Sequence, residues 1–227
     1  VRIGALPRTP TGRLGYGLVW DVDATLREYT RASLALVDGQ EAELAPLSRC
    51  SLLQLGSRDY EVFVSSTIPT TLRQRLAGKV GNLISHTIRY PGHADQMAFL
   101  LDDLKLRDRV YMLRNLFLNA LPEITDDRLL ISITAASRGA DGASHEHFLR
   151  EVEPIQIGDA SIGAMRRTAA SHLAAVLDLL RLGRIGGRGL LAQEDIPLNL
   201  LRENRFLGWF LETSTAGPGC VWQGTPQ

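Results

Sequence analysis

The sequence has few cysteines, no excess of either charge and no long hydrophobic run. Cys50 and Cys220 are its two cysteines, too few for a disulfide framework, so both are expected to be free thiols in a reducing compartment. Lys+Arg and Asp+Glu number 25 each, which gives no electrostatic reason to expect nucleic acid or an anionic membrane as a partner. Without a membrane-length apolar run or a secretory signal, the sequence predicts a cytoplasmic protein.

Several catalytic and metal-binding motifs are also missing. There is no Gly-x-Ser-x-Gly, no zinc-protease His-Glu motif and no paired-cysteine zinc spacing. The glycine-rich segment 183–189 follows a predicted helix instead of a strand, so it is interpreted as a helix end and loop, not as a dinucleotide cradle. His145 and His147 share one strand face but lack an obvious third ligand, so no metal site is predicted.

The pattern that is present predicts an α+β fold, a mixed β-sheet with helices packed on it. The opening residues 1–16 are rich in glycine and proline and are interpreted as a loop. Strands or hairpins are expected at 15–20, 32–46, 60–66, 82–90 and 128–153, and helices at 21–29 (capped by Asp21), 93–106, 108–121 and 164–183. The apolar stripe of the last helix is predicted to be Ala169, Leu173, Val176, Leu177 and Leu180.

The densest group of chemically useful side chains is "SHTIRYPGH", residues 85–93. Strand alternation places Thr87 and Arg89 on one face, and Pro91-Gly92 ends the strand before a helix. Arg89 could hold a substrate carboxylate through two parallel N–H bonds, and the first amides of the helix, near His93, attract anions. The alternative is that Arg89 pairs with a neighbouring acidic residue and that His93 only caps the helix.

Several stretches together resemble the C-terminal domain of the saccharopine dehydrogenase family, most of all its lysine 6-dehydrogenase-type branch. They occur in the family's order and span most of the chain, and "TIRYPGH" after "GKV" is the most specific of them. The stretches are "GALP" (4–7), "LGYGLVW" (14–20), "LREYT" (26–30), "VDG" (37–39), "YEVFVSS" (60–66), "GKVGNLISHTIRYPGH" (78–93) and "QEDIPL" (193–198).

This resemblance implies a substrate-binding and dimerisation domain over residues 1–210, followed by a loosely ordered tail at 211–227. NAD or NADP would be bound mainly by an N-terminal Rossmann domain that this chain lacks, and a start at Val1 instead of Met fits a piece of a longer polypeptide. The implied reaction is hydride transfer at the CH–NH group of an amino acid or amine, in a cytoplasmic homodimer of lysine metabolism. The fragment alone would be inactive.

The resemblance also implies site residues. It places Trp20, Thr87, Ile88 and Arg89 at or near the substrate, and His93 joins them from the anion argument above. Ser66 and Thr67 stand where saccharopine reductases carry an arginine for the distal carboxylate, which favours a smaller or less acidic amine. Asp21 replaces the usual serine after the tryptophan; it would meet a substrate ammonium or cap the helix.

No catalytic residue is assigned, because the acid/base residues of the family lie mainly in the absent half. Two alternatives remain open. One is a carboxynorspermidine-type dehydrogenase that forms polyamines on the same scaffold. The other is a non-catalytic interaction or dimerisation module.

Overall fold

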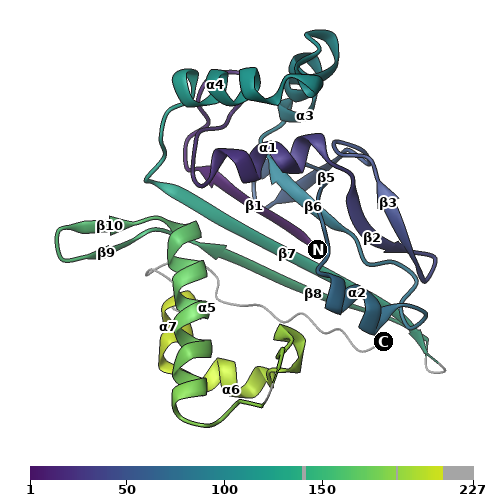
Figure 1. Cartoon of the computed structure of the whole chain (residues 1–227), viewed down its shortest axis with the longest axis vertical. Helices are drawn as coiled ribbons and strands as arrows, with labels where there is room; N and C mark the ends of the chain where they lie inside the picture. The colour runs from purple at the N-terminus through teal and green to yellow at the C-terminus, as the bar shows by residue number, and fades with distance from the viewer. Residues whose placement is uncertain (140–141, 188, 212–227) are drawn as a thin grey trace.

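A six-stranded mixed sheet forms the centre of the computed structural model, which describes residues 1–139, 142–187 and 189–211. The strand order is β4-β5-β6-β1-β7-β8, as Figure 1 shows. The strands are β1 Arg2–Pro7, β4 Ser51–Leu55, β5 Arg58–Ser66, β6 Ser85–Arg89, β7 Asp127–Gly139 and β8 Gly142–Val152. β1 runs parallel to β6, and the other neighbours pair antiparallel. The predicted α+β class is confirmed.

The central strand β1 corrects the prediction of a loop at the start of the chain. Its residues pair with β7 along their whole length, and Ala5 and Leu6 are buried on opposite faces of the sheet. Position 4 of this strand requires glycine, because a Cβ there would collide with the carbonyl oxygen of Ile88 on β6. The loop signals therefore act only after Pro7, at the left-handed glycines Gly12 and Gly15.

The strand predicted at 15–20 is also wrong. This segment makes only an isolated bridge between Leu18 and Glu123, and it lies over the core without joining the sheet. Gly17 approaches Ile124 and Pro122 too closely for a side chain. The segment thus acts as a packed connection that leads into the first helix.

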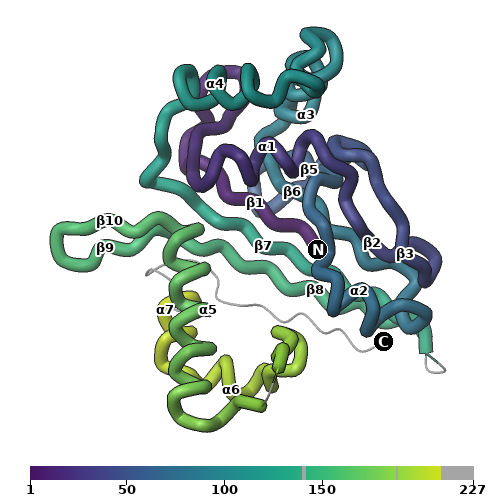
Figure 2. Tube along the Cα trace, in the orientation of Figure 1, coloured from purple at the N-terminus to yellow at the C-terminus, as the bar shows by residue number. Residues whose placement is uncertain are grey.

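Three helices cover one face of the sheet (Figures 1 and 2). They are α1 Val22–Thr30, α3 His93–Ala98 and α4 Val110–Ala120; a π-helical turn, η1 Phe99–Asp103, and a 3-10 turn, η2 Leu106–Asp108, connect the last two. Asp21 caps α1 as predicted, and its Oδ1 accepts the Ala24 N–H at 2.6 Å. Leu26, Tyr29, Phe63, Met97 and Phe117 form the core between helices and sheet.

Hairpins complete the sheet region. The β2–β3 pair, Ser33–Val37 and Gln40–Leu44, turns at Asp38 and Gly39, both with positive φ (51° and 80°), as the Asp-Gly pair predicts. A short helix, α2 Thr70–Leu76, follows β5. The β7–β8 hairpin also forms as predicted, with residues 140 and 141 of its turn outside the described part.

The histidine pair, the cysteines and the helix lengths weighed in the sequence can be located among the described residues. His147 Nε2 lies 3.1 Å from Ser132 Oγ, and no group of three candidate metal ligands occurs among the described residues. Cys50 is a free, exposed thiol, while Cys220 lies outside the described part. No helix of the described chain has both the length and the apolar character needed to cross a bilayer.

A second group of elements follows β8, and in Figure 1 its helices lie below the sheet while its hairpin extends to the left. It contains the hairpin β9 Ile155–Ile157 and β10 Ala160–Ile162, the long helix α5 Ala164–Arg181, the 3-10 turn η3 Gln193–Asp195, and the helices α6 Leu198–Glu203 and α7 Arg205–Leu211. Gly183 ends α5 with φ 65°, as predicted. Of the tail expected at 211–227, Leu211 ends α7 and residues 212–227 lie outside the described part.

The predicted apolar stripe of α5 is wrong. Its leucines, Leu173, Leu177 and Leu180, are exposed, and Val176 is only partly buried. The buried face instead carries Ser171, Ala175, Asp178 and Leu179, since this side packs against α6, α7 and β7. Polar residues tolerate this burial because they find partners: Asn204 Nδ2 donates to Asp178 Oδ2 at 3.1 Å.

Candidate functional site

Strand β6 brings Thr87 and Arg89 to the sheet face beneath α1. Both side chains are buried there, near Phe63 on β5 and Tyr29 on α1. Ile88 points to the opposite face, where it packs with Leu6 and Tyr90. The alternation predicted for this strand is confirmed, and the side chain of Ile88 is therefore not part of the Thr87–Arg89 group.

The Arg89 guanidinium is held by neutral partners. Nε donates to the Tyr29 hydroxyl at 3.0 Å, Nη1 donates to the Ile88 carbonyl at 2.9 Å, and the guanidinium carbon lies 4.8 Å from the centre of the Tyr16 ring. These bonds use two of the five N–H groups of a guanidinium. Within the described residues, none of the ion pairs includes Arg89.

Arg89 forms no ion pair among the described residues, but the Glu28 carboxylate is near enough to act on its charge, so both sequence-based interpretations of Arg89 stay predictions. Arg89 is only 3% exposed. A buried cation without a carboxylate is costly, and native proteins usually pair it. The other three N–H groups of Arg89 make no hydrogen bond to the described residues, and a carboxylate is the acceptor that such groups bind most strongly.

His93 and Tyr29 fix the position of Arg89. Tyr29 Oη lies 3.0 Å from His93 Nε2, and His93 Nδ1 lies 2.9 Å from the carbonyl oxygen of Leu14. A carbonyl can only accept, so Nδ1 carries the proton, Nε2 accepts from Tyr29, and the tyrosine oxygen is free to accept from Arg89. Burial and the Arg89 charge lower the pKa of His93 to about 3, so the ring is neutral.

Glu28 is the residue that sequence reasoning missed at this site. It neighbours Tyr29 on α1, and burial raises the pKa of its carboxyl, while the Arg89 charge and a hydrogen bond with Ser66 act in the opposite direction. The side chain is half-buried, so it also reaches solvent. Glu28 lies within "LREYT" (26–30), one of the stretches that carry the family resemblance. Only the fold brings it near Arg89, which lies 61 positions later in the chain.

Hydroxyl groups extend the cluster toward the end of β5. Thr87 Oγ1 is hydrogen-bonded to Ser65 Oγ and lies 3.4 Å from Ser66 Oγ. Thr67 is exposed, and its Oγ1 accepts the Leu34 N–H at 3.2 Å. Trp20 is 37% exposed, next to the Asp21 cap of α1. Ser66 thus joins the Thr87–Arg89 group, whereas Thr67 supports the β2 strand.

The amides at the start of α3 already bind a carboxylate of the chain itself. Glu61 is buried on β5; its Oε2 accepts the Gly92 N–H at 2.8 Å and its Oε1 accepts the Ala94 N–H. Gly92 has φ 90°, a conformation that suits glycine. An incoming anion would have to displace Glu61, so the anion-binding capacity of the site rests on Arg89 instead of on the helix amides near His93.

We call the group of Glu28, Tyr29, Ser66, Thr87, Arg89 and His93 the Arg89 cluster. Chemically it offers a buried cation with free N–H groups, a half-buried carboxylate beside it and hydroxyls at its edge. A zwitterionic or amine-bearing carboxylic acid matches this pattern of charges.

Comparison with solved structures shows that the fold of this chain is similar to that of a known enzyme. The chain is similar to the apo, histidine-tagged saccharopine dehydrogenase (L-Glu forming) from Saccharomyces cerevisiae, with a TM-score of 0.66 and 14% sequence identity. The alignment covers 88% of this chain and 62% of that one, so the chain spans less than two thirds of the length of the yeast enzyme. No family model matches the sequence. The fold of this chain is therefore similar to that of the matched part of saccharopine dehydrogenase.

Proposed function

We propose that this chain is the substrate-binding part of an NAD(P)-dependent oxidoreductase that acts on the CH–NH group of an amino acid or amine. The observation that supports the proposal is a buried Arg89 whose hydrogen bonds go to neutral groups, with the Glu28 carboxylate near it, in a fold similar to that of saccharopine dehydrogenase. Such a cation stays buried at lower cost when a ligand carboxylate binds it directly.

The residues of the cluster then have distinct roles. The free N–H groups of Arg89 bind the substrate carboxylate, with Thr87 beside it. Glu28 faces the substrate nitrogen and balances its positive charge. Ser66 lies at the edge of the cluster, and its hydroxyl favours a distal end without a negative charge, because no arginine stands in this position.

When bound, the nicotinamide cofactor supplies the acceptor for the hydride that leaves the substrate carbon. The described residues offer no phosphate cradle for it: the glycine-rich segment 183–189 follows a helix, and leucines line the cavity beside it. The proposal includes NAD or NADP bound by a part of the enzyme outside this chain. The proposal includes a homodimer in the cytoplasm.

A polyamine-forming dehydrogenase is a second candidate. Glu28 and the uncharged Ser66 favour it, because a diamine presents more positive charge than a dicarboxylic substrate does. A substrate panel separates the two, since only the first candidate oxidises a free amino acid.

The experiment begins with the full-length parent protein, titrated with NAD and with NADP. A panel of amino acids and diamines is then added, and the reduced nicotinamide is followed by absorbance. Tight binding of one nucleotide and turnover with an amine substrate are expected. Binding of neither nucleotide would overturn the oxidoreductase and leave a non-catalytic interaction module.

A further inference from the structure

The face of the sheet that lies opposite the Arg89 cluster carries a second group of basic side chains. His86 directly precedes Thr87 on β6, so strand alternation turns its side chain to this far face, which also carries Ile88. Arg2 on β1 is the neighbour of His86 in the parallel register, and both side chains are only partly buried. Figure 1 shows β6, β1, β7 and β8 side by side in this order. A ligand that approaches the far face therefore meets an arginine beside an imidazole.

The side chain of Arg2 extends across β7 toward β8. Its Nη1 donates to Thr134 Oγ1 at 3.2 Å, although its register neighbour on β7 is Ser132. Thr134 pairs with His147 on β8, and His147 Nε2 lies 3.1 Å from Ser132 Oγ. Residues that pair across a sheet share a face, so His147 joins Arg2 and His86 on the far face.

A second arginine lies on the other side of His86. Val64 on β5 pairs with His86, and the Val64 N–H donates to the carbonyl of Ser48 at 2.9 Å. Arg49 follows Ser48 and is exposed. Burial lowers the pKa of His86 most, and the positive charges of the first amino group, Arg2 and Arg49 lower it further. We call the four basic residues the far-face cluster: Arg2, Arg49, His86 and His147.

The far-face cluster carries positive charge that no ion pair balances in the described part of the chain. None of the ion pairs between described residues includes Arg2 or Arg49. Like charges that lie close together repel, and an anion between them relieves this repulsion. A metal ion does not suit the cluster, because no group of three candidate metal ligands occurs among the described residues and β1 places Arg2 between the two imidazoles. The cluster therefore favours an anionic ligand.

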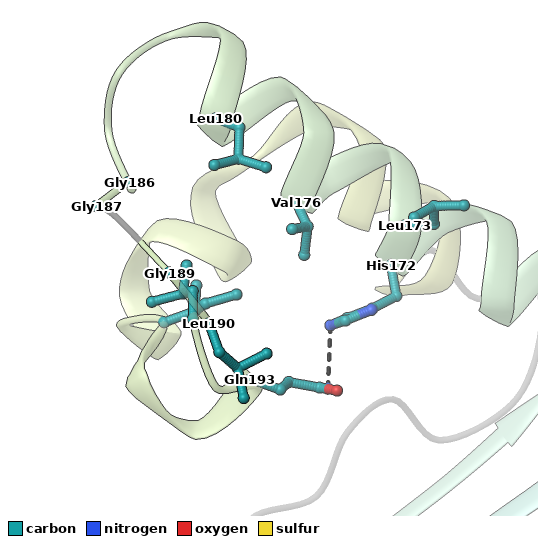
Figure 3. Close-up of a pocket in the computed structure, with 11 residues that line it drawn as sticks. His172, Leu173, Val176, Leu180, Gly186, Gly187, Gly189, Leu190 and Gln193 are labelled. Carbon is teal, nitrogen blue, oxygen red and sulfur yellow. Dashed lines mark hydrogen bonds between the residues drawn. The ribbon is translucent and has the colours of Figure 1, made fainter.

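The cavity beside α5 in Figure 3 lacks these features. Its described lining consists mainly of leucines and glycines and includes neither arginine nor lysine. Its one described imidazole, His172, is hydrogen-bonded to Gln193 at 3.2 Å. An anion thus finds more partners on the far face of the sheet than beside the glycine-rich segment 183–189.

The spacing of the strands indicates the size of the anion. Three strand intervals separate β6 from β8, and neighbouring strands lie about 4.8 Å apart, so the strands of His86 and His147 are about 14 Å apart. One phosphate group is too small to contact side chains from both strands together with the arginine between them. Two linked phosphate groups reach further and carry more charge.

We propose that the far-face cluster binds a soluble ligand with two linked phosphate groups, a diphosphate. Arg2 offers the forked N–H pair that suits phosphate oxygens, and the imidazoles of His86 and His147 offer N–H donors on either side of it. Arg49 adds a second guanidinium, which stays charged at physiological pH. The sheet separates this site from the Arg89 cluster, so its ligand is distinct from the proposed substrate, and the inference does not rest on the proposed function.

The test is isothermal titration calorimetry of the 227-residue chain with inorganic pyrophosphate at constant ionic strength. Wild type should bind one pyrophosphate with a Kd below about 1 mM, and inorganic phosphate about 10-fold more weakly or worse. Arg2→Gln and His147→Gln should each weaken pyrophosphate binding by about 10-fold or more, with an unchanged circular dichroism spectrum. A parallel titration with ADP identifies the source of the diphosphate, since tighter binding than that of pyrophosphate indicates a nucleotide.

The matched control is Arg31→Gln, which removes the charge of an exposed arginine at the end of α1 and should leave binding unchanged. Equal weakening by Arg31→Gln would overturn the inference, because net charge alone would then explain the binding. Absence of saturable binding by wild type up to about 10 mM pyrophosphate would also overturn it, and so would full binding by both Arg2→Gln and His147→Gln. Arg89→Lys should bind pyrophosphate as wild type does, so failure of this site and failure of the oxidoreductase are distinguishable.

Discussion

Nε of Arg89 donates a hydrogen bond of 3.0 Å to the hydroxyl of Tyr29, a residue 60 positions earlier in the chain. The same hydroxyl lies 3.0 Å from His93 Nε2. The end of β6, the helix α1 and the start of α3 are thereby joined through one oxygen atom. It holds the guanidinium, three of whose N–H groups make no hydrogen bond to the described residues. The tyrosine and the histidine position the residue that we propose binds the substrate.

Tyr29→Phe should destabilise the chain by about 1–3 kcal/mol, because it leaves the buried Nε of Arg89 without an acceptor. The measurement is urea unfolding followed by circular dichroism. Tyr16→Phe is the matched control, since Tyr16 is also fully buried but its hydroxyl lies 3.5 Å from Thr25 Oγ1 and contributes little. Equal losses of unfolding free energy in the two variants would show that the Arg89–Tyr29 hydrogen bond does not stabilise the fold more than the contact of the Tyr16 hydroxyl does.

The free energy of unfolding should decrease as the pH is lowered, because of His93. Its pKa drops from 6.5 to about 3 on folding, so between these values the unfolded chain binds a proton that the folded chain does not. The stabilisation is complete above pH 6.5 and is lost toward pH 3, at about 1.4 kcal/mol per pH unit. His93→Gln should show a shallower slope between pH 6.5 and 4.5. Parallel slopes for the two proteins would mean that His93 is protonated in the fold.

Glu28→Gln should stabilise the chain at pH 7 while it weakens substrate binding by the parent enzyme. The pKa of this carboxyl is raised in the fold above its ordinary value of 4.5, so its ionised form destabilises the native state. This cost is absent below pH 4.5, grows as the pH rises toward the raised pKa of the folded carboxyl and is constant above it, and the stability gain of the variant should follow the same course. Urea unfolding at pH 4 and pH 7 measures it. A variant less stable than wild type at pH 7 would contradict the assignment.

Glu61→Ala should cost about 2 kcal/mol or more, since it removes a buried carboxylate that accepts the Gly92 and Ala94 amides at the start of α3. Asp21→Ala removes the exposed cap of α1 and should cost about 1 kcal/mol. Thermal unfolding of both variants gives the comparison. If Glu61→Ala cost no more than Asp21→Ala, the α3 amides would be available to an external anion after all.

Sequence patterns predicted the parts of the fold that depend on neighbouring residues. The Asp38-Gly39 turn, the Asp21 cap and the alternation of Thr87 and Ile88 are confirmed because each is decided within a few residues. β1 was missed because its strand character comes from partners about 80 and 130 positions away. The contact of Gly4 with Ile88 cannot be read from the local sequence.

The candidate site divides in the same way. Strand alternation placed Thr87 and Arg89 together, but Tyr29 and Glu28 reach Arg89 only through the packing of α1 on the sheet. The spacing of the α5 leucines predicted the helix correctly but its buried face wrongly. Periodicity shows which residues share one side of a helix, but it does not show which side the rest of the chain covers.

The central claim is that Arg89 binds the carboxylate of the substrate. The most direct test compares lysine with cadaverine, which differ by one carboxylate, as substrates of the full-length parent enzyme carrying wild-type Arg89 or Arg89→Lys. Wild type should prefer lysine in kcat/KM by about 10-fold or more, and Arg89→Lys should remove most of that preference because the forked N–H groups are lost. An equal preference in both enzymes would contradict the account and place the carboxylate elsewhere.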